Sequence, residues 1–320
     1  MRRVLLAIAT CIGLGSFPAQ AEYPEKPIRI VVPYAAGGTA DIFARFVAER
    51  LGTKWKHEFI VDSRAGAGGN IGSDYVAKSS PDGYTLLLGT SGSNAVNPTL
   101  YKTMPYKADK DLVLVALVAE TANVLVTGPQ HSAKSVEDII ALARAKPGKV
   151  TFASSGNGSV LHLSGVLLAS KKGVEMLHVP YKGTAPALLD VIGGRVDMMI
   201  ANGPSVVGDI HGKKLNALAV TTATRASALA DVPTMMEAGV ADYNLSSWFG
   251  IFAPSGIPDP VRLKLNAAIG EAVQEPQTRE RFQALGAEPV SLDAEKARKF
   301  FLSELEKWGE LVRVSGAQVD

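Results

Sequence analysis

Residues 28–51 read IRIVVPYAAGGTADIFARFVAERL, and this stretch decides the fold. Apart from Arg29, the segment Ile28–Val32 is apolar and β-branched, which is typical of a buried strand. A run of small residues follows, and from Asp41 apolar residues recur at helical spacing. A strand, a glycine loop and a helix start in this order aim unpaired backbone N–H groups and a positive helix end at one point. Such a point can hold an anion, although the glycines could also form a simple tight turn with Asp41 as the helix cap.

The same constellation returns about 115 residues further on. A strand is expected at Val150–Ala153, then the loop Ser154–Ser159, then a helix at Val160–Ser170 that is apolar nearly all round. Two further strands, Met176–Val179 and Val196–Ile200, also run into loops of small and polar residues. Repetition of the motif favours an anion-binding role over a chance turn.

Two glycine-rich stretches in the first third invite other interpretations that their spacing does not support. The stretch 64–72 lacks the glycine and lysine positions of nucleotide-binding loops, so it is expected only to lead into a helix near Ser73–Lys78. The strand Tyr84–Gly89 runs into Thr90–Asn94, where a nucleophile elbow would need a glycine in place of Ser93. Without a base, Ser91 is interpreted as a hydrogen-bonding group; a surface turn stabilised by hydroxyls is the alternative.

Two long strands predict how the chain is divided. The apolar run Leu112–Val126 is long enough to leave one lobe and enter another, and Trp248–Pro254 could cross back. We therefore expect one lobe from residues 22–122 and 243–320, and a second from 123–242. Residues 231–234 are expected to open a short helix in the second lobe.

The N-terminus has the three parts of a secretory signal peptide. Arg2 and Arg3 precede an apolar run to Phe17, and residues 19–21 read AQA, so cleavage is expected after Ala21 and the protein is expected in the periplasm. Cleavage removes the only cysteine, Cys11, and leaves 31 basic against 31 acidic residues. This balance argues against nucleic acid as a partner, and no disulfide or thiol chemistry is expected.

No catalytic or metal-binding constellation is recognisable. None of the five histidines is paired with another at a spacing of three or four residues, so no metal and no cofactor are expected. His162, in the first turn of a helix, is interpreted as structural, as are Asp190 and Asp197. The chain is expected to bind a ligand and not to transform it.

The sequence also resembles the periplasmic receptors of tripartite tricarboxylate transporters, the TctC-like or Bordetella-uptake-gene family. The resemblance rests on motifs in order along the whole mature chain. They include Val32-Pro33 with Gly37-Gly38 and Asp41, Arg64 to Gly69, Pro81 to Leu86, His178 to Gly183, Asp231 to Thr234, and Trp248. It implies the two-lobed α/β fold of type II periplasmic binding proteins, each lobe a sheet flanked by helices, with two chain crossings. It also implies a small carboxylate held between the lobes, largely by backbone N–H groups, hydroxyls and waters, and delivered to integral membrane transporter subunits.

The candidate ligand-binding residues lie in the strand-to-helix loops of both lobes, and no catalytic residue is assigned. They are Tyr34, Gly37, Gly38, Thr39, Asp41, Ser91, Asn94, Ser155, Gly158, Ser159, Gly183, Thr184, Ala185 and Asn202. One departure from the family is Tyr34-Ala35-Ala36, where members often carry Phe-Pro-Pro or Phe-Ala-Pro. The phenol would add a polar group to the cleft wall. No arginine falls in these loops, so a bidentate carboxylate clamp is not expected.

Two alternatives to a transport receptor remain. A ligand-sensing receptor for a membrane sensor would have the same cleft, and the gene neighbourhood would separate the two. An exported serine hydrolase would need a nucleophile, a base and an acid in one site. We expect the mature protein to be a monomer.

Overall fold

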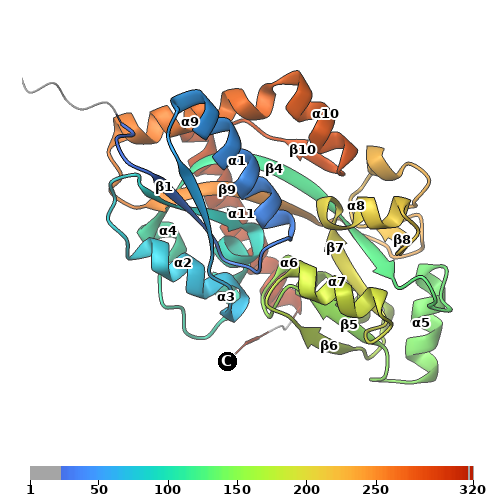
Figure 1. Ribbon diagram of the computed structural model, residues 1–320. Helices are drawn as coiled ribbons and strands as arrows, with labels where there is room; N and C mark the ends of the chain where they lie inside the picture. The colour runs from blue at the N-terminus through green and yellow to red at the C-terminus, as the bar shows by residue number, and fades with distance from the viewer. Residues whose placement is uncertain (1–22, 316–317, 320) are drawn as a thin grey trace, which may run out of the picture.

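The computed structural model describes residues 23–315 and 318–319, so the predicted signal peptide lies outside the described residues. The chain forms an α/β fold in which one long strand, β4 (Leu112–Thr127), belongs to two groups of strands. Along the sheet the strand order is β2-β1-β3-β9-β4-β7-β5-β6, with β10 and β8 also paired to β4. Figure 1 shows the two groups as two lobes side by side.

The first lobe contains the N-terminal motif and the C-terminal third. Its other strands are β1 (Ile28–Val32), β2 (Phe59–Ser63), β3 (Thr85–Thr90), β9 (Ser246–Pro254) and β10 (Ala287–Pro289). Its helices are α1 (Thr39–Trp55), η1 (Ala67–Gly69), α2 (Asn70–Ala77), the π-helix η2 (Ser91–Val96), α3 (Asn97–Leu100), α4 (Ala108–Asp111), α9 (Asp259–Gln274), α10 (Pro276–Ala284) and α11 (Ala294–Ser315).

The second lobe contains the repeated motif. Its strands are β5 (Thr151–Ser154), β6 (Leu177–Pro180), β7 (Met198–Asn202) and β8 (Asn216–Val220). Its helices are α5 (Val136–Ala145), α6 (Val160–Lys172), α7 (Thr184–Ile192), α8 (Gly203–His211) and η3 (Ser227–Leu229).

The strand β4 changes partners at one point. Up to Ala122 it pairs with β9, in the register Ala122 to Ser246, and from Asn123 it pairs with β7, in the register Asn123 to Asn202. The chain returns from the second lobe at Leu245, whose N–H still bonds to Thr221 O at the end of β8. The two crossings predicted from strand length are therefore present.

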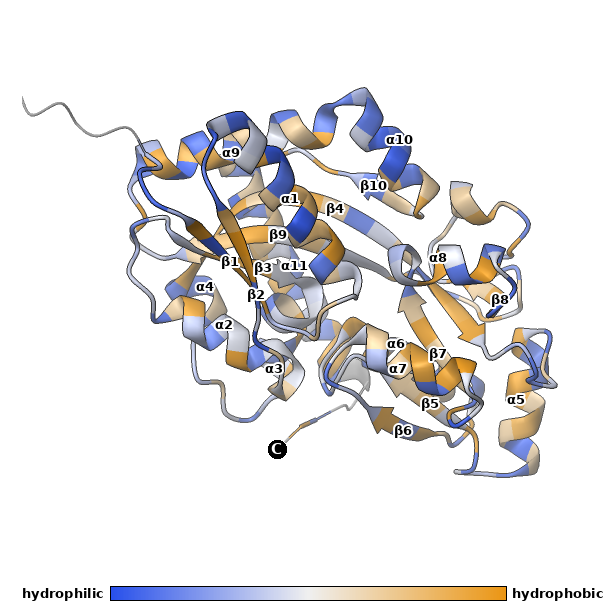
Figure 2. Cartoon of the chain, in the orientation of Figure 1, coloured by the Kyte–Doolittle hydropathy of each residue, from blue (hydrophilic) through white to orange (hydrophobic). Residues whose placement is uncertain are grey.

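Alternation along β1 explains why helices cover both faces of the first lobe. Ile28, Ile30 and Val32 join a core with α1, α9 and α10, whereas Val31 joins the opposite core, which includes α11. Figure 2 shows the strands coloured as hydrophobic and the outer helices with mixed faces. The core that includes α11 also takes in side chains of α6 and β7, so one apolar core connects the lobes.

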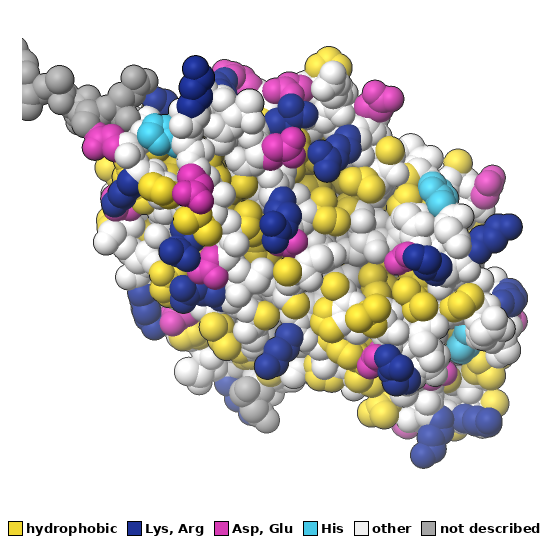
Figure 3. All heavy atoms as spheres, viewed as in Figure 1, with side chains coloured by type: hydrophobic (Ala, Val, Ile, Leu, Met, Phe, Trp, Pro, Cys, Tyr) yellow, Lys and Arg dark blue, Asp and Glu magenta, His cyan; other side chains and the backbone are white. Residues whose placement is uncertain are grey.

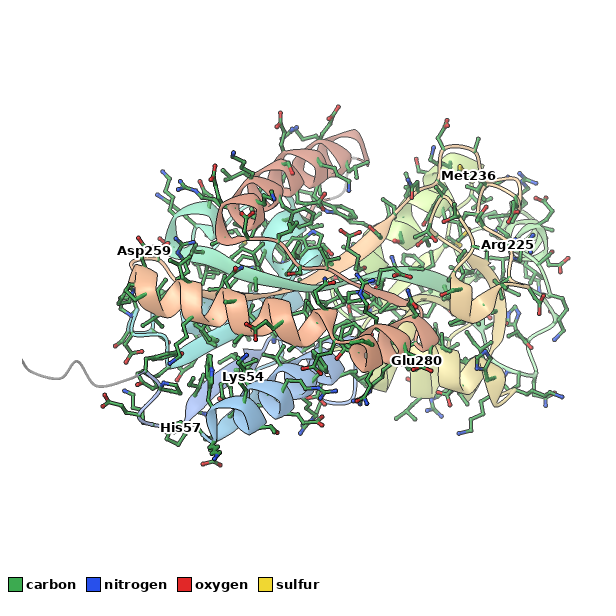
Figure 4. All side chains as sticks on the ribbon, turned by 90° about the horizontal axis from the view of Figure 1, so that it is seen from above. Lys54, His57, Arg225, Met236, Asp259 and Glu280 are labelled. Carbon is green, nitrogen blue, oxygen red and sulfur yellow. The ribbon has the colours of Figure 1, made fainter. Side chains whose placement is uncertain are left out.

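Figure 4 shows α9 and α10 running along one side of the molecule, from Asp259 to Glu280, next to Lys54 of α1. Lys54 is paired with Glu271 of α9, which ties the two helices at the surface. Arg225 and Met236 lie at the far end, in the second lobe (Figure 4). There, Arg225 pairs with Glu237 at 2.9 Å.

Three expected elements differ from those observed. Helix α1 begins at Thr39, two residues before Asp41, because Gly38 already has the extended conformation of an N-cap. Helix α2 begins at Asn70, before the expected start. The short helix after Thr234 is wrong: residues 235–239 form turns, in which Thr234 and Glu237 bond reciprocally and no longer helix follows.

Candidate functional site

A small cavity lies between the lobes, where the strand-to-helix loops converge. It is lined by Tyr34, Gly38, Thr39, Ala40, Thr90, Ser91, Gly92, Ser155, Ser159, Val160, Leu161, Thr184, Asn202, Ser247 and Phe249. Its volume is about 30 Å³, which is room for roughly two water molecules. An organic acid needs more space, so the lobes or their side chains must move apart to admit one.

Four helices present their N-terminal ends to this cavity. Gly38, Ser159 and Asn202 are the N-caps of α1, α6 and α8, and Thr184 is the first residue of α7. The first backbone N–H groups of each helix have no partner within the helix, and each helix dipole places positive potential at this end. The π-helix η2 adds Ser91 and Gly92 from the first lobe. The convergence of these ends makes the cavity a site for an anion.

No charged side chain lines the cavity. Arg64 and Lys182, the cations in the surrounding loops, do not contribute to it. The polar contacts available to a ligand are therefore backbone N–H groups, the hydroxyls of five Ser and two Thr residues or of Tyr34, and the Asn202 amide. Such neutral donors stabilise an anion through hydrogen bonds to its oxygens.

The count of hydroxyls in the preceding paragraph is wrong and is corrected here: the lining holds four Ser and three Thr. They are Ser91, Ser155, Ser159, Ser247, Thr39, Thr90 and Thr184.

Eight of the fourteen residues predicted from the sequence line the cavity. They are Tyr34, Gly38, Thr39, Ser91, Ser155, Ser159, Thr184 and Asn202. They come from both lobes, so the structure brings together loops that are up to 168 residues apart in the chain.

The other six predicted residues lie around the cavity without lining it. Asp41 accepts a hydrogen bond from Gly37 N at 3.1 Å, so both residues stabilise the loop before α1. The Asn94 amide oxygen accepts from Thr90 N at 3.2 Å inside the first lobe. Gly158 and Gly183 have positive φ, and their Cα atoms pack against the first lobe. Ala185 lies one residue after Thr184 in the first turn of α7.

The Tyr34 phenol is held by the first lobe. Its oxygen lies 3.2 Å from Thr90 Oγ1 and 3.3 Å from Gly68 O, to which it donates. Burial raises the pKa of this phenol, which keeps it neutral. The hydroxyl thus joins three loops of the cleft wall.

Sequence reasoning missed seven lining residues. Ala40, Thr90, Gly92, Val160 and Leu161 flank predicted positions, whereas Ser247 and Phe249 lie on β9. The neighbours could have been found by extending each loop into its helix. Ser247 and Phe249 carry no local signal, because only the return of β9 to the first lobe places them at the cavity.

Two histidines support the loop Ser154–Ser159 from behind. The rings of His162 and His178 stack with centroids 3.9 Å apart, and His178 Nε2 lies 2.7 Å from Ser154 Oγ. Burial lowers the pKa of His162 to about 4; burial and then the neighbouring His162 lower the pKa of His178 to about 3. Both rings are neutral near pH 7, and neither lines the cavity.

A two-lobed α/β chain with an anion site between its lobes has the architecture of a periplasmic binding protein. The relatives agree. The model of the tripartite tricarboxylate transporter family receptor matches residues 43–317, and the chain belongs to this family. It is 39% identical to the protein BugT of Bordetella pertussis over 323 residues, covering 100% of this chain and 99% of BugT.

Solved structures of similar chains support the same assignment. A protein of R. palustris determined with adipate has a TM-score of 0.90 and 35% identity, covering 93% of this chain and 100% of that chain. MatC from Rhodopseudomonas palustris, with bound malate, has a TM-score of 0.86 and 30% identity, covering 91% of this chain and 100% of that chain. Within the described residues, no helix is both long and apolar enough to span a membrane.

Proposed function

We propose that this chain is a periplasmic receptor that captures a small carboxylate between its lobes and delivers it to the membrane subunits of a tripartite transporter. The observation that carries the proposal is the convergence of four helix N-termini on one cavity lined by hydroxyls. Structures of similar proteins with adipate and malate support the ligand class.

The donors are sufficient for useful affinity. Each helix terminus contributes about 0.3–1 kcal/mol, and about 2 kcal/mol where it is partly buried. Each hydrogen bond to a charged group adds on the order of 1.5–3 kcal/mol. After the cost of ordering the ligand, three or four such bonds are compatible with micromolar affinity, about −8.2 kcal/mol.

The proposal includes the chain's processing and organisation. The mature protein begins at Glu22 and is a monomer in the periplasm. The first lobe comprises residues 22–122 and 243–320, and the second 123–242; the change of partners along β4 supports these boundaries. Charges of both signs are interspersed over the face in Figure 3, which supports the absence of a nucleic-acid surface there.

A thermal-shift screen of the mature protein against mono-, di- and tricarboxylates and aromatic acids tests the proposal. A ligand at a hundredfold excess over Kd adds about 2.7 kcal/mol to the free energy of unfolding, so at least one acid should raise Tm by several degrees. Gly38→Val should weaken that response far more than Lys182→Ala. An added Cβ at Gly38 already lies 3.6 Å from Thr184 Cβ, so the larger Val side chain would occupy the space between α1 and α7. No response to any acid would contradict the proposal.

The proposal also states that the chain does not react with its ligand. Ser91 Oγ accepts from Trp248 N at 3.4 Å, and no histidine lines the cavity. Esters and amides of the bound acids should therefore be recovered unchanged. Turnover that is lost in Ser91→Ala or Ser155→Ala would show a hydrolase instead.

A further inference from the structure

We propose that the cleft selects acids without an ammonium group: it binds an organic acid that carries only negative charge and rejects the corresponding amino acid. This inference rests on the proposed function and deepens it by naming the charge class of the ligand. An ammonium group needs an acidic partner or several free acceptors when it is removed from water.

The cavity has no acidic partner to offer. The segments that supply most of its lining, residues 34–40, 90–92, 155–161 and 247–249, contain no Asp or Glu. The two remaining lining positions, Thr184 and Asn202, are neutral. A ligand ammonium would therefore meet no opposite charge in the lining.

The buried acids of the described residues are Asp41 and Glu304, and both are engaged elsewhere. Asp41 Oδ2 accepts from Arg45 Nε at 2.8 Å, and the Arg45 side chain is 61% exposed, so this ion pair faces the outer side of α1. The other oxygen, Oδ1, is buried without a partner among the described residues, but Asp41 does not line the cavity.

Glu304 lies behind the cavity wall. Its carboxylate accepts the indole N–H groups of Trp248 and Trp308, at 2.8 and 2.7 Å, and pairs with Lys307. Trp248 follows the lining residue Ser247, so its indole and this ion pair separate the negative charge from the cavity.

The neutral acceptors at the cavity are largely in use. Ser159 Oγ accepts from His162 N and donates to Gly156 O. Asn202 Nδ2 donates to Asn123 Oδ1, which leaves the Asn202 carbonyl oxygen for a ligand. Four positive helix ends surround these acceptors and oppose a cation. The site therefore has donors for carboxylates and little that stabilises an ammonium.

Matched acids that differ by one ammonium group test the inference. Calorimetry of the mature protein compares succinate with aspartate, glutarate with glutamate, adipate with 2-aminoadipate, and phenylacetate with phenylglycine. For any acid that binds, the amino analogue should bind about 30-fold more weakly or worse, since placing like charges together costs several kcal/mol. Equal affinities within a pair would overturn the inference and leave the carboxylate receptor intact. Binding of none of the eight would contradict both proposals.

A variant pair at Thr184 provides a second measurement. Thr184→Asp places a carboxylate at the first position of α7, where an acid suits the helix, and Thr184→Asn is its neutral isostere. The Asp variant should narrow the acid-to-amino-acid affinity ratio by about tenfold or more, because it repels carboxylates and attracts ammonium. The Asn variant should keep the ratio. Circular dichroism confirms that both are folded, and an unchanged ratio in a folded Thr184→Asp protein would overturn the inference.

Discussion

Gly92 is the residue at which the first lobe comes closest to helix α6. A Cβ at this position would lie 3.2 Å from Ser159 Cα and 3.4 Å from Val160 N, both backbone atoms of the second lobe. These contacts are tighter than ordinary packing and cannot be relieved by a side-chain rotation. The absence of a side chain at Gly92 therefore allows the lobes to close.

Gly92→Ala should weaken ligand binding about tenfold or more while leaving the first lobe folded, because the methyl group separates the lobes. Titration of the best acid from the screen measures the change. Gly208→Ala is the matched control, since a Cβ there meets nothing within 4 Å. Equal binding by the two variants would contradict a requirement for close approach at Gly92.

At the scale of elements, the stacked histidines connect β5, β6 and α6. His178 bonds to Ser154 at the end of β5, and His162 Nδ1 accepts from Gly158 N at 3.4 Å. These contacts fix the loop that presents Ser155 and Ser159 to the cavity. The loop geometry thus depends on both rings staying neutral.

Acid should destabilise the protein through this pair. Because both folded-state pKa values lie below the ordinary value of 6.5, the unfolded chain binds protons first as the pH falls. Stability should be fully present above about pH 6.5 and decrease toward pH 4, by at most about 1.4 kcal/mol per pH unit for each histidine. Urea unfolding at pH 8, 6 and 5 measures this slope.

His162→Phe isolates the contribution of the pair, because Phe can keep the stack and cannot titrate. The variant should lose less stability between pH 8 and pH 5 than the unmodified protein. The comparison at pH 8, where both rings are neutral, reports the packing difference alone. A variant with the same acid sensitivity would exclude His162 as a cause.

At the scale of the whole molecule, the lobes are closed and joined by hydrogen bonds across the cleft. Ala35 N donates to Lys182 O at 2.8 Å, and Tyr101 OH donates to Asn157 O at 3.1 Å. The hydroxyls of Thr39 and Ser205 lie 2.7 Å apart. A ligand that contacts both lobes adds to these bonds and favours the closed form.

Tyr101→Phe should shift the protein toward the open form, since one hydrogen bond contributes about 0.5–1.5 kcal/mol. Small-angle scattering without ligand should show a larger radius of gyration than for the unmodified protein, and saturating ligand should reduce it. Tyr75→Phe is the control: Tyr75 lies on α2 under the Arg64 guanidinium, 3.5 Å from the ring centroid, a contact that Phe preserves. Identical radii for the two variants would show that the Tyr101 bond does not influence closure.

The sequence by itself determined the strands, the glycine loops and the helices that follow them, because these signals are local. Gly37-Gly38 before α1 and Ser159 before α6 are read from neighbouring residues, and the length of β4 predicted the crossing between lobes. The family and its fold followed from motifs in order along the chain.

Only the tertiary structure decided which loop residues face the cavity. Gly158 and Gly183 look like ligand contacts in the sequence, yet they pack against the opposite lobe, since their positive φ turns the chain there. Phe249 and Ser247 give no local signal and reach the site because β9 returns beside β4. The convergence of four helix N-termini likewise depends on how two separately folded lobes meet. Local sequence encodes elements, whereas their meeting depends on packing between residues far apart in the chain.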